Sequence, residues 1–222
     1  MNILGIQKTG DILKLERMSN LNNKIQKINE LHKGDFISLY DLEYKNKLNQ
    51  DKHWSVATRK DKEVLEDFYL NNKEDKVDAV GIVAYHVEYK KLVIIKQFRV
   101  PINDYLYELP AGLVDKDDKD IFESVKRELK EETGLNLLDV NHDYTIEKTY
   151  LSPGMTDESI ALVFCTCDGE LNKDNLEDDE DIEAMLISQD KAKDILKSKE
   201  KMDVKAFLML QNFALLGEKL FL

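Results

Sequence analysis

From Val77 to Ile187 the chain is a succession of short runs rich in Val, Ile, Tyr and Phe, separated by polar turns and interrupted by one helical stretch. Such β-branched and aromatic residues favour strands. The runs are VDAVGIVAYHVEY, KLVIIKQFRV, LYELP, DYTIEKTYL, ESIALVFCTC and DIEAMLIS. Many strands with few helices predict an α/β or α+β fold, with a mixed sheet sandwiched between helices.

Three helices are expected beside these strands, at about residues 120–132, 189–199 and 203–217. The last contains AFLMLQNFALL, which is apolar on nearly every turn, so we expect a core or interface helix. Membrane binding by this helix is the weaker alternative. No stretch of the chain approaches the roughly 18 consecutive apolar residues that a bilayer-spanning helix needs.

Residues 1–75 form a less regular part, and residues 76–222 form the main domain. In the first part we expect a short helix from Leu21 to Leu31, and then two strands, in FISLYDLEY and HWSVATRK, around the turn KNKLNQD. Two strands cannot bury a face by themselves. They are expected to pack on the rest of the chain or on a second subunit. For residues 1 to about 33 the alternatives are a dimer contact and a substrate lid.

The charge balance restricts the partners of the chain. It has 44 acidic and 32 basic residues and a formal net charge of −12, which disfavours binding to the backbone of nucleic acids. An anionic ligand would need local cations or metal ions to overcome this field. The first residues lack the ordered zones of a secretory signal, which favours a cytoplasmic protein.

The two cysteines, Cys165 and Cys167, are two residues apart in a strand-like run. Both therefore lie on one face of the strand, too close along it for a comfortable disulfide. We expect reduced cysteines that pack in the interior.

One helix carries the most informative side chains. At ~100° per residue, an apolar stripe runs along residues 120–132, formed by Ile121, Phe122, Val125 and Leu129. Glu128 and Glu132 lie along the edge of this stripe, with Glu131 beside them. Like charges at this spacing repel each other unless a cation bridges them. The helix should end at Gly134, a suitable C′ residue.

Two interpretations of these carboxylates are open. Proteins bind Mg²⁺ through one or two carboxylates, with water and substrate phosphates as further ligands, so the helix is a candidate metal site. The alternative is a solvated acidic helix face on which Arg127 pairs with Glu131.

The wider segment ELPAGLVDKDDKDIFESVKRELKEETGLNL resembles the Nudix box, a Gly followed at fixed spacing by Glu and then by Arg-Glu-aliphatic-x-Glu-Glu-x-Gly-aliphatic. The second half matches in register at Arg127, Glu128, Leu129, Glu131, Glu132, Gly134 and Leu135. The first glycine is Gly112. Fourteen residues separate Gly112 from Arg127, one more than in the pattern, so the first Glu of the box falls on Asp118 or Lys119.

The resemblance implies a Nudix-like fold and hydrolysis of a diphosphate with Mg²⁺, or with Mn²⁺ in its place. Glu128, Glu132 and the main-chain carbonyl of Ala111 would hold the metal ions, and Glu131 would contribute through water. The ions would neutralise the diphosphate and lower the pKa of the attacking water.

Catalytic roles are implied for Arg127, Glu131 and Glu180. Glu180 lies just before the last strand, in an acidic stretch that resembles the loop carrying the catalytic base, and it would accept the proton of the water. Glu183 is the competing candidate, and a merely solvated acidic loop is the third interpretation.

The run IIKQFRVPINDYLYELPAGLVD resembles the ADP-ribose pyrophosphatase branch of the family. Arg99 would then meet the diphosphate, and Glu108 would lie near the metal or the ribose. A guanidinium suits bidentate phosphate contact, although a surface arginine at a strand end is the alternative. Farther along, SPGMTDE resembles a loop in which Met155 or Asp157 could contact the sugar.

The run HWSVATRK resembles the same branch, in which Trp54 would stack on adenine and Arg59 would approach the ligand. Packing within the strand pair is the alternative for Trp54. Because these strands cross to the partner subunit in the family, the resemblance implies a homodimer.

The expected function is hydrolysis of ADP-ribose or a related nucleoside diphosphate sugar, giving AMP and a sugar phosphate. A Nudix hydrolase acting on a dinucleoside polyphosphate or a damaged nucleotide is the first alternative. A regulator that binds nucleotide sugars without cleaving them is the second.

Overall fold

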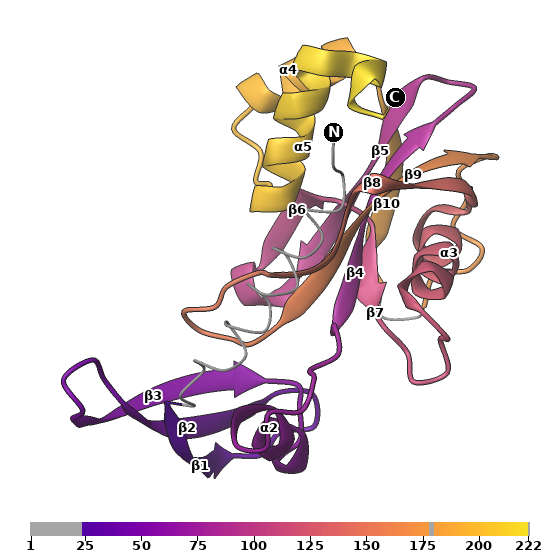
Figure 1. The fold of residues 1–222 in the computed structure, drawn as a ribbon. Helices are drawn as coiled ribbons and strands as arrows, with labels where there is room; N and C mark the ends of the chain where they lie inside the picture. Colours follow the sequence, from indigo (N-terminus) through magenta and orange to yellow (C-terminus); the bar gives the residue numbers. More distant parts are fainter. Residues whose placement is uncertain (1–23, 178–179, 222) are drawn as a thin grey trace, which may run out of the picture. The chain divides into compact units, whose positions relative to one another are not determined.

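The computed structural model describes residues 24–177 and 180–221, which divide into two compact units (Figure 1). Unit 1 contains the described residues up to Lys76 together with Ser152–Asp157. Unit 2 contains Val77–Leu151 and the described residues from Glu158 onward. Each unit is described by itself below.

Unit 1 is a three-stranded antiparallel sheet with one helix. Strands β1 (Ile25–His32), β2 (Ser38–Lys45) and β3 (Asp51–Thr58) lie in the order β1-β2-β3, and helix α2 (Lys62–Tyr69) follows. Its small core is formed by Ile28, Tyr40, Leu42, Val56 and Leu65. The two expected strands are confirmed as β2 and β3, but they are not alone, because β1 and α2 help them to bury a face.

The expected helix from Leu21 to Leu31 is wrong for the part of it that the structure describes. From Ile25 the chain is a strand, which pairs with β2 from Ile25 opposite Tyr44 to His32 opposite Leu39, and residues 21–23 lie outside the described ranges. Apolar residues three or four apart suggested the helix, but only Ile28 of this strand is buried. Pairing with β2 overrides the local pattern.

Unit 2 contains the mixed sheet that the sequence predicts. Its strands run in the order β10 (Ile182–Ile187), β5 (Lys91–Arg99), β4 (Ala79–His86), β9 (Ser159–Asp168) and β8 (Asn136–Tyr150). Strands β4 and β9 are parallel, and the other pairs are antiparallel. Two short strands extend the sheet: β6 (Asp104–Glu108) pairs with β5 after the 3₁₀ turn η1 (Val100–Ile102), and β7 (Ala111–Leu113) pairs with β4.

Helices cover both faces of this sheet (Figure 1). Helix α3 (Ile121–Thr133) packs on one face, while α4 (Gln189–Lys197), α5 (Val204–Leu216) and the turn η2 (Gly217–Leu220) lie on the other. The mixed sheet between helices is therefore confirmed, and so is the expected core helix, since α5 buries Ala206, Leu210, Phe213 and Ala214. None of the helices in the described ranges is long and apolar enough to span a bilayer.

The two faces of the sheet can be followed residue by residue, because successive side chains of a strand point to opposite faces. In β5, Val93 belongs to the core on the α3 side, and Leu92 and Ile94 belong to the core on the α4–α5 side. Cys165 and Cys167 of β9 are both buried on the α3 side as free thiols, as expected. Burial raises the pKa of Cys167 to about 12, so this thiol is protonated at neutral pH.

Candidate active site

Helix α3 begins and ends where its sequence specifies. The Asp120 side chain accepts hydrogen bonds from the amides of Phe122 and Glu123, which caps the first turn. Gly134 ends the helix with a φ of 79°, a left-handed conformation that favours glycine. These caps fix which side chains of α3 face the sheet.

Two carboxylates of α3 are buried, Glu128 at 8% and Glu132 at 3% exposure. Burial raises the pKa of both above the ordinary value, most strongly for Glu132, because desolvation disfavours the charged form. Glu132 Oε2 accepts a hydrogen bond from the backbone amide of Ala111 at 2.9 Å. Among the described residues, no lysine or arginine forms an ion pair with Glu132. Glu132 is therefore a buried carboxylate whose charged form lacks an ion-pair partner within the described part of the chain.

Strand β7 comes unusually close to this end of α3. A Cβ atom added to Gly112 would lie 1.9 Å from the carboxyl carbon of Glu128. Only a residue without a side chain leaves room for that carboxylate. Gly112, the first glycine of the box, is thus required because any side chain there would overlap with the Glu128 carboxylate.

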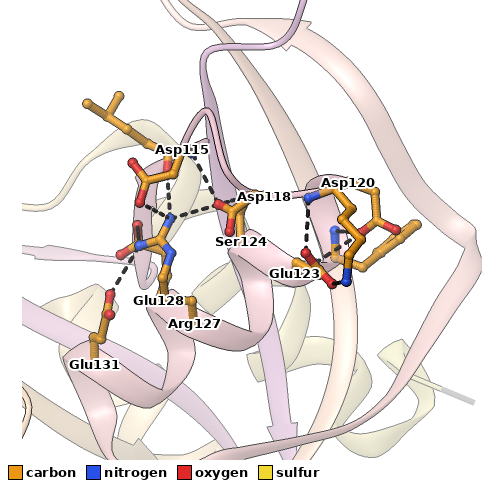
Figure 2. Close-up of polar contacts among 11 residues, drawn as sticks. Asp115, Asp118, Asp120, Glu123, Ser124, Arg127, Glu128 and Glu131 are labelled. Atoms are coloured by element: carbon orange, nitrogen blue, oxygen red, sulfur yellow. Dashed lines mark hydrogen bonds and ion pairs between the residues drawn. The ribbon is translucent and has the colours of Figure 1, made fainter.

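The Arg127 guanidinium joins several parts of the box (Figure 2). Its Nη1 lies 2.7 Å from Glu128 Oε1 and 3.1 Å from Glu131 Oε2, while its Nη2 donates to the carbonyl of Leu113 at 2.9 Å and to Asp118 Oδ2 at 3.0 Å. Burial opposes the charge of Arg127, but these hydrogen bonds outweigh it and raise its pKa. The pairing of Arg127 with Glu131 is therefore real and exists together with the buried carboxylates.

Asp118, and not Lys119, takes the place of the first Glu of the box. The chain turns from Asp115 to Asp118, whose Oδ2 accepts hydrogen bonds from the Asp115 amide, the Ser124 hydroxyl and Arg127. The Arg127 hydrogen bond keeps the pKa of Asp118 below its ordinary value. Lys119 points elsewhere and pairs with Glu123 at 2.9 Å. The turn accommodates the extra residue and brings the shorter Asp side chain to Arg127.

Arg99 and Glu108 form a bidentate pair on β5 and β6. Arg99 Nη2 lies 2.6 Å from Glu108 Oε2, and Arg99 Nε lies 3.1 and 3.2 Å from the two carboxylate oxygens. Burial disfavours the charge of Arg99, but Glu108 outweighs it and raises the pKa of Arg99, with a smaller contribution from Glu132. Arg99, which is expected to contact the phosphates, is thus held near the box, where it already pairs with the Glu108 carboxylate.

The two candidate bases, Glu180 and Glu183, act on different groups. Glu183 lies opposite Lys96 and contributes to the electrostatic environment of Lys96 and Tyr107, on the α4–α5 side. Glu180 precedes the strand, and its charge raises the pKa of both Glu128 and Glu132. The geometry thus brings Glu180 and not Glu183 to the carboxylates of α3.

A model of the NUDIX domain matches residues 75–209, which include this entire arrangement. The chain belongs to the Nudix family. Similar proteins include an ADP-ribose pyrophosphatase of Saccharomyces cerevisiae, 29% identical over 81% of this chain and 75% of the yeast protein. An ADP-ribose pyrophosphatase of Bacillus subtilis is 31% identical over 62% and 72% of the two chains. A GDP-mannose pyrophosphatase of Cronobacter sakazakii is 30% identical over 72% and 84%. Family and relatives identify a Nudix pyrophosphohydrolase of the ADP-ribose pyrophosphatase-like branch.

The Nudix box of this chain fits a hard divalent cation. Its donors are carboxylate oxygens, which Mg²⁺ prefers, and Glu128 and Glu132 are buried side by side on successive turns of α3. A bound cation would favour the charged form of both carboxylates, whose pKa values are raised mainly by burial. Ala111, whose carbonyl is the third expected ligand, contacts Glu132 because its backbone amide donates a hydrogen bond to that carboxylate.

The remaining expected site residues lie in unit 1. Trp54, on β3, is 51% exposed, and Arg59 follows the end of that strand. Met155 is 72% exposed, and its carbonyl accepts a hydrogen bond from the Ala57 amide at 3.0 Å. Asp157 is half-buried, and its carboxylate lies 3.2 Å from Lys60 Nζ within unit 1.

A second set of potential metal ligands lies on the sheet of unit 1. Asp41, Glu43 and His53 place one ligand atom each within 4.8 Å of one another. Their charges already have partners, since His53 Nδ1 lies 2.8 Å from Asp41 Oδ2 and Lys27 Nζ lies 3.4 Å from Glu43 Oε1. In the Nudix box, Glu132 has no ion pair among the described residues, so the box is the stronger candidate metal site.

Proposed function

We propose that this Nudix enzyme hydrolyses the diphosphate linkage of ADP-ribose, or of a closely related nucleoside diphosphate sugar, with Mg²⁺ as its cofactor. Water would attack one phosphorus atom, the anhydride P–O bond would break, and AMP and ribose 5-phosphate would leave. The observation that carries this proposal is the burial of Glu128 and Glu132 without cationic compensation for Glu132.

In this proposal Glu128, Glu132 and the carbonyl of Ala111 hold the metal, and Glu131 contributes through water. When bound, the metal supplies positive charge at the diphosphate oxygens and lowers the pKa of the attacking water. Arg127 keeps Glu128 and Glu131 in place.

Glu180 would accept the proton of the attacking water. The charge of Glu180 acts on Glu128 and Glu132, the proposed metal ligands, and a base must lie within reach of the attacking water. Glu183 is the weaker candidate, because it lies on the face of the sheet opposite α3.

The substrate contacts that we propose follow the resemblance to the ADP-ribose pyrophosphatase branch. Arg99 would exchange part of its pairing with Glu108 for the diphosphate, as a guanidinium suits bidentate phosphate contact. Trp54 would stack on the base and Arg59 would approach the phosphates, with Met155 and Asp157 at the sugar end.

ADP-ribose is preferred over other substrates because two of the similar proteins are ADP-ribose pyrophosphatases, and because the Arg99 and Trp54 segments resemble that branch. A GDP-mannose-like sugar nucleotide is the second candidate, favoured by the similar GDP-mannose pyrophosphatase. We also propose a homodimer, since the family resemblance of the β2–β3 region implies one.

A substrate panel tests the proposal directly. Purified protein is incubated with Mg²⁺ or Mn²⁺ and with ADP-ribose, GDP-mannose, a dinucleoside polyphosphate or an oxidised nucleotide, and the nucleoside monophosphate released is measured. We expect ADP-ribose to be cleaved well above the others, and Glu132→Gln to lose activity by orders of magnitude while keeping its fold. Full Mg²⁺-dependent activity in Glu132→Gln, or silence across the whole panel, would refute the proposal.

A further inference from the structure

The segment that carries Glu180 is held only weakly by strand pairing. Strand β10 begins with Ile182 opposite Gln97, and one further backbone hydrogen bond runs from the Phe98 amide to the Asp181 carbonyl at 3.1 Å. Glu180 lies one residue beyond that bond. Its own hydrogen bonds, from its amide to the Glu177 carbonyl and from the Glu177 amide to its Oε2, are local and do not reach the sheet.

A side-chain contact strengthens this junction on the α4–α5 face of the sheet. Phe98 of β5 lies opposite Tyr105 of β6 on one side and next to Asp181 on the other. The Tyr105 hydroxyl donates a hydrogen bond to the Asp181 carboxylate, and the Tyr105 ring packs edge-on against Phe98 at 5.4 Å between centroids. Side chains of β6, β5 and the start of β10 are thus joined in one row.

The contact can act on Glu180 because Asp181 is the next residue in the chain and lies immediately before β10. Asp181 points to the α4–α5 side, where Tyr105 holds it. The charge of Glu180 acts on Glu128 and Glu132, the buried carboxylates of α3. Because Tyr105 holds the Asp181 side chain, the backbone of the preceding residue, Glu180, is also restrained.

We propose that Tyr105 is a positioning residue for the hydrolysis reaction, which acts through Asp181 to hold Glu180 towards the carboxylates of α3. This inference rests on the proposed function, in which Glu180 is the base. A base must lie within hydrogen-bond reach of the attacking water, and a displacement of about 1 Å costs up to roughly 100-fold in rate. A single backbone hydrogen bond would leave the Glu180 segment free to move by such amounts.

The first experiment compares Tyr105→Phe with the wild-type protein in steady-state hydrolysis of ADP-ribose. Loss of the hydroxyl should lower kcat roughly tenfold and leave KM within about twofold, because substrate contacts are unchanged. Asp181→Ala should repeat this loss. Asp181→Asn keeps an oxygen that accepts the hydrogen bond and should retain most of kcat.

Tyr89→Phe is the matched control. The Tyr89 hydroxyl also donates to an exposed carboxylate, Glu170, at 2.6 Å, but this pair is not attached to the Glu180 segment. Its removal should leave kcat unchanged.

A double-mutant cycle separates positioning from a general structural effect. In a Glu180→Gln background the base is absent, so Tyr105→Phe should cause no further loss of kcat. A merely structural role would lower kcat by the same factor in both backgrounds. That result, or a kcat of Tyr105→Phe within about twofold of wild type, overturns the inference.

Amide hydrogen exchange gives a readout that does not depend on activity. The Phe98 amide donates to Asp181, so its exchange should become faster in Tyr105→Phe and stay unchanged in Tyr89→Phe. Unchanged exchange of the Phe98 amide in Tyr105→Phe would contradict the proposal that Tyr105 holds the Glu180 segment. If the wild-type protein cleaves nothing in the panel, the proposed function fails, while the exchange at Phe98 still decides whether Tyr105 holds the segment.

Discussion

At the scale of single residues, Arg127 organises the box. It contacts the side chains of Asp118, Glu128 and Glu131 and the carbonyl of Leu113 at once, and only about a quarter of its side chain is exposed. Asp118, which also accepts a hydrogen bond from the Ser124 hydroxyl, holds Nη2 of Arg127, while Nη1 contacts Glu128 and Glu131. A substitution of Asp118 should therefore disturb the position of Glu128 indirectly, through Arg127.

We predict that Asp118→Ala lowers kcat/KM for ADP-ribose by roughly ten- to 100-fold, the usual range for residues that orient a metal ligand. It should also weaken the metal dependence of the rate, measured as the Mg²⁺ concentration at half-maximal activity. Lys119→Ala is the control, because Lys119 pairs only with Glu123 at the surface, and it should be active. Equal activity of the two variants would show that Arg127 needs no partner at this position.

His53 should titrate above its ordinary pKa of 6.5, because its hydrogen bond to Asp41 stabilises the protonated ring. The same bond lowers the pKa of Asp41. A raised folded-state pKa means that the pair stabilises the protein fully below pH 6.5, and that this contribution disappears as the pH rises through the raised value. An NMR titration of the ring should show the shift, and Asp41→Asn should bring the pKa back towards 6.5. A His53 pKa that is the same in both proteins would contradict the pairing.

At the scale of secondary-structure elements, the site depends on the close approach of β7 to α3. Gly112 allows it, and the Ala111 amide holds Glu132 at the same place. We predict that Gly112→Ala keeps its fold, because the clashing group is the end of a flexible Glu128 side chain. It should nevertheless lose at least about tenfold in activity, as Glu128 is displaced from Arg127.

Circular dichroism and ADP-ribose hydrolysis together test the Gly112→Ala prediction. Gly154→Ala is a suitable comparison, because nothing lies within 4 Å of a Cβ atom added there. Wild-type kcat in Gly112→Ala would mean that the approach of β7 is not needed.

Helices and strands with a strong sequence pattern could be predicted, and those with a weak or misleading pattern could not. Helix α3 could be predicted with its ends, because Asp120, Gly134 and the apolar stripe agree with one another. Strand β1 could not, since Ile25, Ile28 and Leu31 have helical spacing and only the pairing with β2 decides the conformation. Helix α2 was not expected, because it buries a single residue, Leu65.

The candidate site was predictable in its residue types but not in all of its pairings. The box identified Glu128 and Glu132, but whether Asp118 or Lys119 meets Arg127 depends on the turn at Asp115. The sequence left Glu180 and Glu183 open as candidate bases, and because β10 begins at Ile182, strand alternation gives the direction of Glu183 but not that of Glu180. Tyr105 gave no sequence signal, because its role depends on the register of three strands.

At the scale of the whole molecule, the chain passes between its two units three times, after Lys76, Leu151 and Asp157. The sequence division into residues 1–75 and 76–222 did not foresee that Ser152–Asp157 would belong to unit 1. Within unit 1, Lys60 lies 3.2 Å from Asp157 and 3.7 Å from Asp75, and all three side chains are at most 10% exposed. This buried ion cluster joins residues that are far apart in the sequence, so local sequence patterns could not predict it.

Trp54 is the only tryptophan of the chain, so its fluorescence reports on a single place. If Trp54 stacks on the base, AMP should change its emission in a saturable way, whereas ribose 5-phosphate, which has no base, should not. Emission that stays constant while calorimetry detects AMP binding would remove Trp54 from the substrate site.

The central claim is that the two buried carboxylates of α3 hold a divalent cation. Calorimetric titration with Mn²⁺ tests it without substrate, comparing wild type, Glu132→Gln and, as a control on the same helix, the surface variant Glu123→Gln. We predict that wild type and Glu123→Gln bind Mn²⁺ alike, and that Glu132→Gln binds it at least about 100-fold more weakly, because a buried ligand and its charge are lost. Wild-type Mn²⁺ affinity in Glu132→Gln would contradict the account.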